Sequence, residues 1–482
     1  MDEILDRALN GAELGGATYA DARVVETRSQ LIEVKNRRVS ALQEGAELGL
    51  GVRVMVGGAW GFAASADVSV AEAERCSRLA CRVAAASARF RHDPIRLSWA
   101  DNHVASYATP LERDPFEVPL PDKLALLTEA TGIMERERGV RVALGNLQLW
   151  DERKHFASSE GARIRQRIVH SGSGIAAWAT DGQDLQVRSY PNSFGGQFES
   201  GGFEIVERLD LPGHAADTAA TAVALLSAPI CPEGMATVIL DGSQMSLQIH
   251  ESCGHPAEFD RALGYEANYA GTSFLTPDLL GKLRYGSEVV NLVADATTAR
   301  GLGTFGFDDE GVPAQKVDLV RAGRFVGYLT SRETAPLLSR LSNGAMRAES
   351  WAHIPLIRMT NINLEPGPWR LEDLIADTGE GVLMVTDRSW SIDDKRYNFQ
   401  FGTEVGWEIK KGKRGRLLKN CTYTGITPEF WNKCDAVCGA SDWEIWGTPN
   451  CGNGQPSQTM RTGQGASPAR FRNVQIGVGY GL

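Results

Sequence analysis

The N-terminal half of the chain carries patterns typical of strands that pack one face on a core. Apolar and polar side chains alternate along residues 31–39 and 48–56, as they do in half-buried strands. Gly57-Gly58 follows the second run and predicts a tight hairpin turn. Between residues 141 and 187, short alternating runs separated by glycine-rich turns predict an antiparallel sheet.

Helical patterns are interleaved with these predicted strands. Ser69 and Glu72 have the spacing of a capping box, so we expect them to open an alanine-rich helix that runs to about residue 86. Pro121-Asp122 predicts the start of another helix, because proline is favoured in a first turn. Two more helices are predicted over residues 3–10 and 215–228. The alternation indicates an α/β N-terminal domain with a mixed or antiparallel sheet.

A break follows the last of these helices. Residues 229–234 contain two prolines and a glycine, which end a helix. Beyond them we expect a β-rich domain, a barrel or a sandwich, because short alternating runs are separated by turn residues. The runs are residues 237–240, 316–320, 324–329, 360–364, 381–385, 403–410 and 472–478. The prediction is an α+β protein of two domains, residues 1–230 and 231–482.

Composition and charge restrict the functions that such a fold could carry. The chain has 482 residues, with 43% hydrophobic and 23% charged residues, as in globular proteins. Its net charge of −10 argues against binding to nucleic acid or to membrane surfaces, since both need a basic face. The basic stretch at residues 410–416 is interpreted as an exposed hairpin turn.

The expected location is the cytoplasm. The chain starts with an acidic segment that lacks the apolar core of an export signal, and it has no apolar run of about 18 residues that could span a membrane. Eight cysteines are sparse for this length, and without an export signal we expect them to be reduced thiols.

The clearest chemical signal is the run His250-Glu251-Ser252-Cys253-Gly254-His255. Neutral imidazoles bind zinc well, and a glutamate beside them can act as a base. On a regular α-helix, a spacing of five puts the two rings about 140° apart, too far to share an ion. Either a π-type widening of the helix, or a helix end near Gly254 and Pro256, would bring the rings together. Two capped or core histidines are the alternative interpretation.

A catalytic zinc site needs three protein ligands and one open position. Cys451 lies in a stretch rich in glycine and proline, where we expect a loop whose thiolate could reach a soft metal. A free loop thiol is the alternative. Candidates closer to the histidines are Glu258, Asp260 and Glu266. The remaining cysteines of interest are interpreted as packing in the core: Cys253, Cys434 and Cys438.

Several other motifs follow in order along the chain. They are Gly264-Tyr265-Glu266, Asp308-Asp309-Glu310-Gly311, Arg347-x-Glu349-Ser350, Pro355-x-x-Arg358-Met359-Thr360-Asn361, Pro449-Asn450-Cys451-Gly452-x-Gly454-Gln455-Pro456 and Ser467-Pro468-Ala469-Arg470-Phe471. Together with the histidine run, they resemble the TldD/PmbA family of metallopeptidases over most of residues 235–482, and more loosely before. Residues 256–260 depart from the glycine-rich segment of better-known members, so the resemblance carries over no substrate preference.

The resemblance implies one Zn²⁺ per chain, held by His250, His255 and Cys451, with Glu251 as general base. It also implies an α/β N-terminal domain and a mostly antiparallel, barrel-like C-terminal domain. The implied substrates are unfolded or modified peptides. The implied assembly is a homodimer, or a heterodimer with a related subunit that lacks the HExxxH motif, and this chain is similar to the metal-binding subunit.

The predicted reaction is hydrolysis of a peptide bond. Glu251 would accept a proton from water activated by zinc and pass it to the leaving amine. His353 and Arg358 are candidates by type for stabilising the oxyanion, although a structural role is the favoured interpretation of each. Asp308-Asp309-Glu310 is interpreted as an acidic turn and not as a second metal cluster.

Two other functions stay open. One is a non-catalytic, zinc-binding subunit that presents peptides within a hetero-oligomeric protease; Glu251 argues against it, because a structural zinc site needs no base. The other is a redox or thiol-dependent enzyme built on Cys253 or Cys451. Whether the protein cleaves peptides or only presents them, an extended peptide could bind by adding a strand to a sheet edge. Such binding recognises the peptide backbone rather than the side chains.

Overall fold

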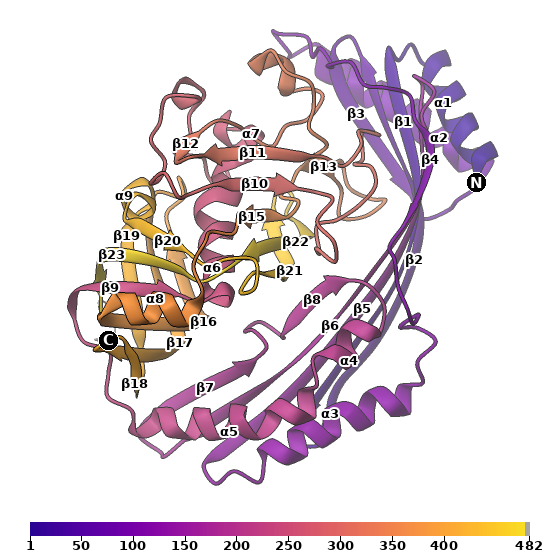
Figure 1. Ribbon diagram of the computed structural model, residues 1–482. Coiled ribbons are helices and arrows are strands. Elements are labelled where there is room, and N and C mark those ends of the chain that lie inside the picture. Colours follow the sequence, from indigo (N-terminus) through magenta and orange to yellow (C-terminus); the bar gives the residue numbers. More distant parts are fainter. Residues whose placement is uncertain (478–482) are drawn as a thin grey trace.

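The N-terminal part of the chain builds one long, curved sheet of eight strands (Figure 1). In the computed structural model, which describes residues 1–477, the strands follow the order β3-β2-β1-β5-β6-β4, and β7 and β8 also pair with β6. The β4–β6 pair is parallel and the others are antiparallel. The strands are β1 (Tyr19–Lys35), β2 (Arg38–Val56), β3 (Ala59–Ser65), β4 (Val104–Ala108), β5 (Val140–Ser158), β6 (Arg163–Thr180), β7 (Leu185–Tyr190) and β8 (Gln197–Ser200).

Helices cover one face of this sheet in two groups (Figure 1). The alternation along β1 explains the arrangement, since successive side chains point to opposite faces. Ala22 lies in a core with the first helix group and Ile32 in a core with the second. Arg23 lies on the other face and donates a hydrogen bond to the carbonyl of His353, in the C-terminal part. The groups are α1 (Asp2–Leu14) with α2 (Val70–Ala88), and α3 (Leu120–Met134) with α4 (Glu204–Arg208) and α5 (Leu211–Ser227).

Five strands of the C-terminal part close into a barrel. They pair in the order β16-β9-β23-β19-β17, and β17 pairs back with β16. The β9–β16 pair is parallel and the other barrel pairs are antiparallel. The predicted mostly antiparallel, barrel-like region is therefore confirmed, as is the α+β class. The strands are β9 (Gly234–Leu240), β16 (Glu380–Ile392), β17 (Asn398–Lys410), β19 (Cys421–Ile426) and β23 (Ala469–Ile476), with β18 (Lys413–Leu418) and β20 (Cys434–Val437) attached to β17 and β23.

Smaller elements surround the barrel (Figure 1). A second sheet has the order β12-β11-β10-β15, and two hairpins are formed by β13 with β14 and by β21 with β22. The strands are β10 (Leu292–Asp295), β11 (Lys316–Arg321), β12 (Arg324–Phe325), β13 (Met346–Arg347), β14 (Leu356–Ile357), β15 (Ile362–Leu364), β21 (Glu444–Asn453) and β22 (Gln458–Ala466). The α-helices are α6 (Gly242–Ile249), α7 (Phe259–Ala262), α8 (Leu371–Thr378) and α9 (Thr427–Asn432). Short 3-10 helices span His255–Ala257, Pro277–Leu279 and Ala335–Leu338.

Some predicted strand boundaries are wrong. Residues 31–39 are not one strand, because Asn36 and Arg37 adopt φ values of +50° and +59° and turn the chain from β1 into β2. A two-residue turn of polar side chains hardly interrupts the alternation of apolar and polar residues in the flanking strands. The alternation alone therefore did not show where β1 ends and β2 begins. Of residues 324–329, the strand keeps Arg324–Phe325. The predicted run 472–478 matches β23 up to Ile476, and its last residue lies outside the described residues.

The boundary between the predicted domains falls between α5 and β9. Helix α5 ends at Ser227 and β9 begins at Gly234, on either side of the proline-containing break. The division into residues 1–230 and 231–482 stays a prediction.

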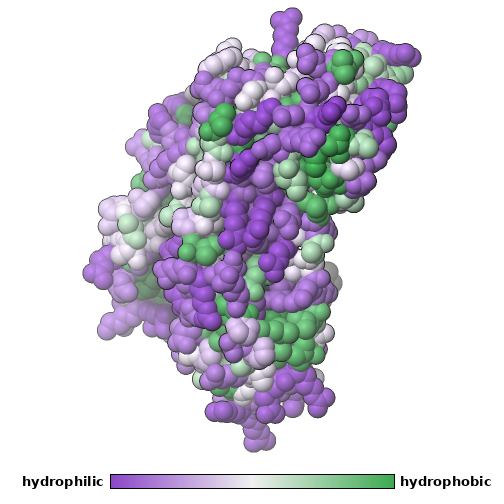
Figure 2. All heavy atoms as spheres, turned by 90° about the vertical axis from the view of Figure 1, so that its right-hand side faces the viewer, coloured by the Kyte–Doolittle hydropathy of each residue, from purple (hydrophilic) through white to green (hydrophobic). Residues whose placement is uncertain are grey.

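Buried ion pairs join the N-terminal sheet to the acidic turn of the C-terminal part. Arg53 lies 2.7 Å from Asp21 and 3.3 Å from Glu310, and Lys154 lies 2.8 Å from Asp309. Asp309 and Glu310 therefore pair with cations of the sheet and Asp308 accepts backbone N–H bonds, which agrees with the interpretation of the segment as an acidic turn. The face of the molecule on the right-hand side of Figure 1, where the N-terminal sheet and its helices lie, is mainly hydrophilic, with separate hydrophobic areas (Figure 2). Among residues 1–477, no helix is long and apolar enough to cross a membrane.

Candidate metal centre

The two histidines meet because the helix that carries them widens. The Asp241 side chain caps α6 by accepting a hydrogen bond from the N–H of Gln244 at 2.9 Å. The helix then passes into a π-helical turn over His250–Gly254, in which the N–H of His255 donates to the carbonyl of His250. An i to i+5 hydrogen bond brings residues five apart into register. The predicted widening is thus observed.

The alternative arrangement, a helix end before His255, does not occur. His255 keeps helical φ and ψ values of −59° and −46°, and a 3-10 helix, His255–Ala257, follows. Pro256 therefore does not push His255 out of the helical region. It occupies the first turn of the 3-10 helix, where a backbone N–H would have no hydrogen-bond acceptor within the helix, so proline is tolerated there.

Cys451 completes a group with the two histidines. The imidazole centroids of His250 and His255 lie 4.9 Å apart with their planes at 88°, and Cys451 Sγ lies 3.5 Å from His255 Nε2. One ligand atom from each of the three residues lies within 4.8 Å of the others. In the described part of the chain, no other His, Cys, Asp and Glu residues form such a group of three.

The position of Cys451 differs from the predicted loop. It lies on strand β21, opposite Met460 of β22, and is 3% exposed. The pairing of the two strands is irregular between Thr448 and Cys451, where Pro449 interrupts the ladder. The glycine- and proline-rich sequence thus marks an irregular hairpin rather than a free loop, and such bulges often direct a side chain into a site.

Neighbouring polar residues hold each of the three side chains. Glu258 Oε2 lies 2.9 Å from Nδ1 of His255, which leaves Nε2 directed at Cys451. Arg358 donates to Cys451 Sγ at 3.0 Å. The amide of Gln464, on β22, lies 3.0 Å from Nδ1 of His250. Such partners fix the ring orientation and basicity of metal ligands.

The pKa shifts of the three side chains are in the direction that favours metal binding. Burial lowers the pKa of both imidazoles, and that of His255 falls well below its ordinary value. Burial alone would raise the pKa of the Cys451 thiol, but His255 and Arg358 outweigh burial and lower it. Metal ligands must be neutral imidazoles and deprotonated thiols. Two imidazoles and a thiolate therefore fit a zinc-type ion, and a cavity in front of them can supply an open position.

The other proposed ligands lie outside the group. Glu258 binds the far nitrogen of His255, and Asp260 and Glu266 are buried but belong to no such group among the described residues. Cys253, Cys434 and Cys438 are buried in apolar clusters, as predicted. Burial raises the pKa of the Cys253 thiol to about 12, which argues against an enzyme built on a reactive Cys253.

A cavity of about 250 Å³, which we call the histidine cavity, opens in front of the three residues. Glu251 lines it and forms an ion pair with Arg396. Arg396 lies in the turn between β16 and β17, which is held by hydrogen bonds from the N–H groups of Tyr397 and Asn398 to the Asp393 carboxylate. The turn thus places the Arg396 guanidinium next to Glu251, although the two residues are 145 positions apart in the sequence.

The candidates for oxyanion stabilisation do not line this cavity. His353 Nδ1 is hydrogen-bonded to Ser350 Oγ at 2.9 Å, and Arg358 lies behind Cys451, fully buried. The structural roles favoured for both agree with these contacts. Sequence reasoning missed Arg396, Gln464 and Asp387, a buried residue that also lines the cavity.

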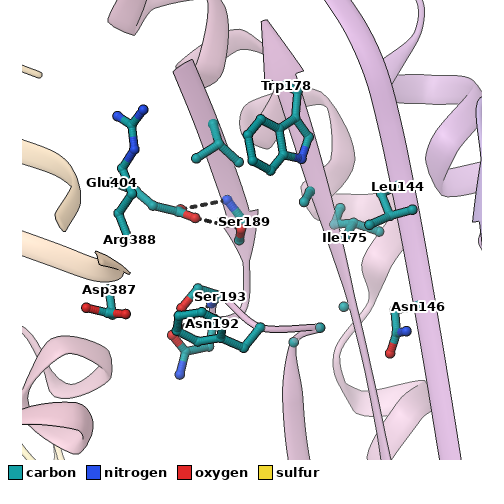
Figure 3. A pocket seen from close by; sticks show the side chains of 16 residues that line it. Leu144, Asn146, Ile175, Trp178, Ser189, Asn192, Ser193, Asp387, Arg388 and Glu404 are labelled. Atoms are coloured by element: carbon teal, nitrogen blue, oxygen red, sulfur yellow. Dashed lines mark hydrogen bonds between the residues drawn. The ribbon is translucent and has the colours of Figure 1, made fainter. Parts of the chain in front are cut away.

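Asp387 also lines a second cavity of about 370 Å³ next to the first, which we call the apolar cavity (Figure 3). Asn192, Ser193 and Phe194 likewise line both. Burial raises the pKa of Asp387 well above its ordinary value; Glu404 and Glu251 raise it further, and the backbone N–H of Arg388 partly opposes them. The two cavities share these four lining residues and lie next to each other between the N-terminal sheet and the barrel, in a region that we call the depression.

Comparison with known proteins agrees with this geometry. Family models match three segments: a PmbA/TldA metallopeptidase domain 1 over residues 20–84, a central domain over 113–226 and a C-terminal domain over 233–478. A protein named metalloprotease from Methanocaldococcus jannaschii is 29% identical over 453 residues, covering 94% of this chain and 95% of that protein. A metalloprotease TldD homolog from Haemophilus influenzae is 27% identical over 437 residues, covering 89% and 86%.

Solved structures share the whole fold. A crystal structure from Thermotoga maritima, described as a modulator of a DNA gyrase, superposes with a TM-score of 0.78 over 99% of this chain and 100% of that chain, at 16% identity. TldE from Thermococcus kodakarensis gives 0.73 over 98% and 99%, also at 16% identity. At this identity the likeness concerns the fold alone. The matched segments and the histidine run together show that the chain belongs to the TldD/PmbA family of metallopeptidases.

Proposed function

We propose that this protein is a zinc-dependent metallopeptidase with one zinc ion per chain. The observation that carries the proposal is the approach of ligand atoms from His250, His255 and Cys451 to within 4.8 Å of one another, with Glu251 on the wall of the same cavity. The names of the relatives, metalloprotease, support the same class of activity.

In this proposal each residue has a distinct task. His250, His255 and Cys451 would hold the zinc ion, which supplies a Lewis acid that acidifies water and polarises a carbonyl oxygen. Glu251 is the general base: its carboxylate accepts a proton from the attacking water and later passes it to the leaving amine. Arg396 keeps the Glu251 carboxylate at the cavity wall through their ion pair.

The substrate and the assembly are also part of the proposal. The substrates are unfolded or modified peptides, and a depression between a sheet and a barrel is a suitable place for an extended chain. The working form is a homodimer, or a heterodimer with a related subunit that lacks the HExxxH motif. The cytoplasmic location expected from the sequence is retained.

Replacement of Glu251 by glutamine tests the catalytic role. Glu251→Gln keeps the shape of the side chain but removes the base, so we expect a full zinc content and a loss of peptide cleavage of about 10²-fold or more. The assay is hydrolysis of an unstructured peptide, followed by mass spectrometry. Wild-type cleavage by the zinc-loaded variant would show that Glu251 is not the base, and absence of cleavage by the zinc-loaded wild type would favour a non-catalytic, peptide-presenting subunit.

A further inference from the structure

Asp387 is a buried carboxylate that has no side-chain partner among the described residues. It is 2% exposed, and neither of its oxygens accepts a hydrogen bond of ordinary geometry from a described residue. It also forms no ion pair with a described cation. Ser193 Oγ, on the opposite segment, is likewise buried and unpartnered. Buried polar groups are nearly always hydrogen-bonded, so two unpaired groups on the walls of the same cavities indicate that a ligand supplies their partner.

The backbone around Asp387 is arranged to hold it in this position. Thr386 adopts a φ of +60°, which is rare for a β-branched residue, and the pairing of β16 with β17 is irregular just after it, between Asp387 and Ser389. Its hydroxyl accepts a hydrogen bond from Arg188 at 2.8 Å, and its N–H donates to Ser243 Oγ at 3.1 Å. These contacts fix the bulge that directs Asp387 toward the two cavities.

The charges around the depression leave one carboxylate uncompensated. Glu251 pairs with Arg396, and Glu404 pairs with Arg188 at 3.3 Å while it accepts hydrogen bonds from the N–H and hydroxyl of Ser189. Figure 3 shows Glu404 directed at Ser189, away from Asp387. The guanidinium of Arg388 is hydrogen-bonded to Gln186 and Asn420. Of these three carboxylates, Asp387 is therefore the one that has no cationic partner among the described residues.

The apolar cavity beside Asp387 gives this ligand a second property. Hydrocarbon side chains form much of its wall, and Figure 3 shows several of them opposite Asp387: Leu144, Ile175 and Trp178. A ligand that satisfies both features has a cationic head and an adjoining hydrocarbon group. A primary ammonium has three N–H donors, which matches the two Asp387 oxygens and Ser193 Oγ.

We propose that Asp387 and Ser193 bind a primary ammonium group of the substrate peptide while the apolar cavity holds the hydrocarbon next to it. The ammonium is either the free N-terminus, with the first side chain in the apolar cavity, or a lysine side chain, with its methylene groups there. This inference rests on the proposed function, because it names the substrate class of the same site.

A binding measurement separates this inference from proteolysis. The probes are 3-methylbutylamine and its uncharged counterpart 3-methylbutanol, neither of which can be cleaved, titrated by ligand-observed NMR. We expect the wild type to bind the amine at least about tenfold more tightly than the alcohol, because a charge-assisted contact to a buried carboxylate is lost with the alcohol. Asp387→Asn should remove this preference, and Ser193→Ala should reduce it several-fold. Asp217→Asn, on the exposed side of α5, is the control and should retain it.

Two outcomes would overturn the inference: equal binding of amine and alcohol by the wild type, or an unchanged preference in a folded Asp387→Asn protein. Peptide kinetics then identify the source of the ammonium. If it is the N-terminus, acetylation lowers kcat/KM about tenfold; if it is lysine, exchange of lysine for norleucine does so. Either change in the peptide should lower kcat/KM mainly by raising KM. In Asp387→Asn, whose zinc content should equal that of the wild type, the same change should have no effect on kcat/KM. Amine binding without any cleavage would contradict the proposed function alone.

Discussion

At the scale of single residues, the site depends on contacts beyond the three proposed ligands, His250, His255 and Cys451. Glu258 is the central example, because its two oxygens contact His255 Nδ1 at 2.9 Å and the N–H of Met359 at 3.2 Å. Two arginines, Arg261 and Arg358, lie 3.8 Å and 3.7 Å from it. This carboxylate thus links one histidine to the arginine that contacts Cys451.

We predict that Glu258→Gln weakens zinc binding by about 10- to 100-fold, as loss of a partner behind a ligating histidine typically does. The amide can still accept the proton of Nδ1, but it supplies no negative charge to the imidazole or to the two arginines. Competition with a chelator of known affinity measures the change. Glu429→Gln, at an exposed position on α9, is the control. An unchanged zinc affinity in folded Glu258→Gln would contradict this role.

At the scale of elements, the π-helical turn over His250–Gly254 requires space on one side. A Cβ atom added to Gly254 would lie 2.0 Å from Sδ of Met359. Gly254 itself has helical φ and ψ values of −59° and −64°, so alanine would suit the backbone there. The close approach of Met359, rather than the backbone conformation, is therefore what requires glycine.

We predict that Gly254→Ala destabilises the protein by about 1–3 kcal/mol through overpacking and also weakens zinc binding. Met359→Ala makes room, so the double variant should be more stable than the sum of the two single changes predicts. Urea denaturation of all four proteins gives this coupling free energy. Strictly additive effects would show that Met359 does not set the size of residue 254.

The sequence predicted some of these elements and site residues but not others. Local alternation predicted four of the five barrel strands but not β19, and Ser69 caps α2 as predicted by accepting a hydrogen bond from the N–H of Glu72. The histidine spacing required either a widened helix or a helix end near Gly254, and the structure has the widened helix, as a π-helical turn. The resemblance, rather than spacing, singled out Cys451. Arg396 and Asp387 escaped prediction because their roles arise from the pairing of β16 with β17 and from packing against distant segments.

At the scale of the whole molecule, buried ion pairs hold the barrel part against the sheet. Lys154 of β5 lies 2.8 Å from Asp309 and 3.2 Å from Glu152. Burial alone would raise the pKa of Asp309, but Lys154 and Arg23 outweigh burial and lower it. The depression that contains the site lies between these two parts, so their attachment shapes it.

We predict that Asp309→Asn lowers the free energy of unfolding at neutral pH by about 3 kcal/mol, because it leaves Lys154 poorly compensated. The folded-state pKa of Asp309 is below the unfolded value of about 3.9, so its stabilisation is present above that pH and is lost as the pH falls through the folded pKa. The difference between wild type and variant should therefore shrink in acid, as urea denaturation against pH would measure. Asp6→Asn, in an exposed pair with Arg163, should cost less than about 1 kcal/mol.

The zinc content of the purified protein tests the central claim most directly. Mass spectrometry of the metal should give about one zinc per chain in the wild type and in Cys253→Ala, whose thiol packs in the core of the same turn. Cys451→Ala should lose most of the zinc, since the site is then left with two histidines. A wild type without zinc, or a full equivalent retained in folded Cys451→Ala, would contradict the assignment of a zinc site to His250, His255 and Cys451.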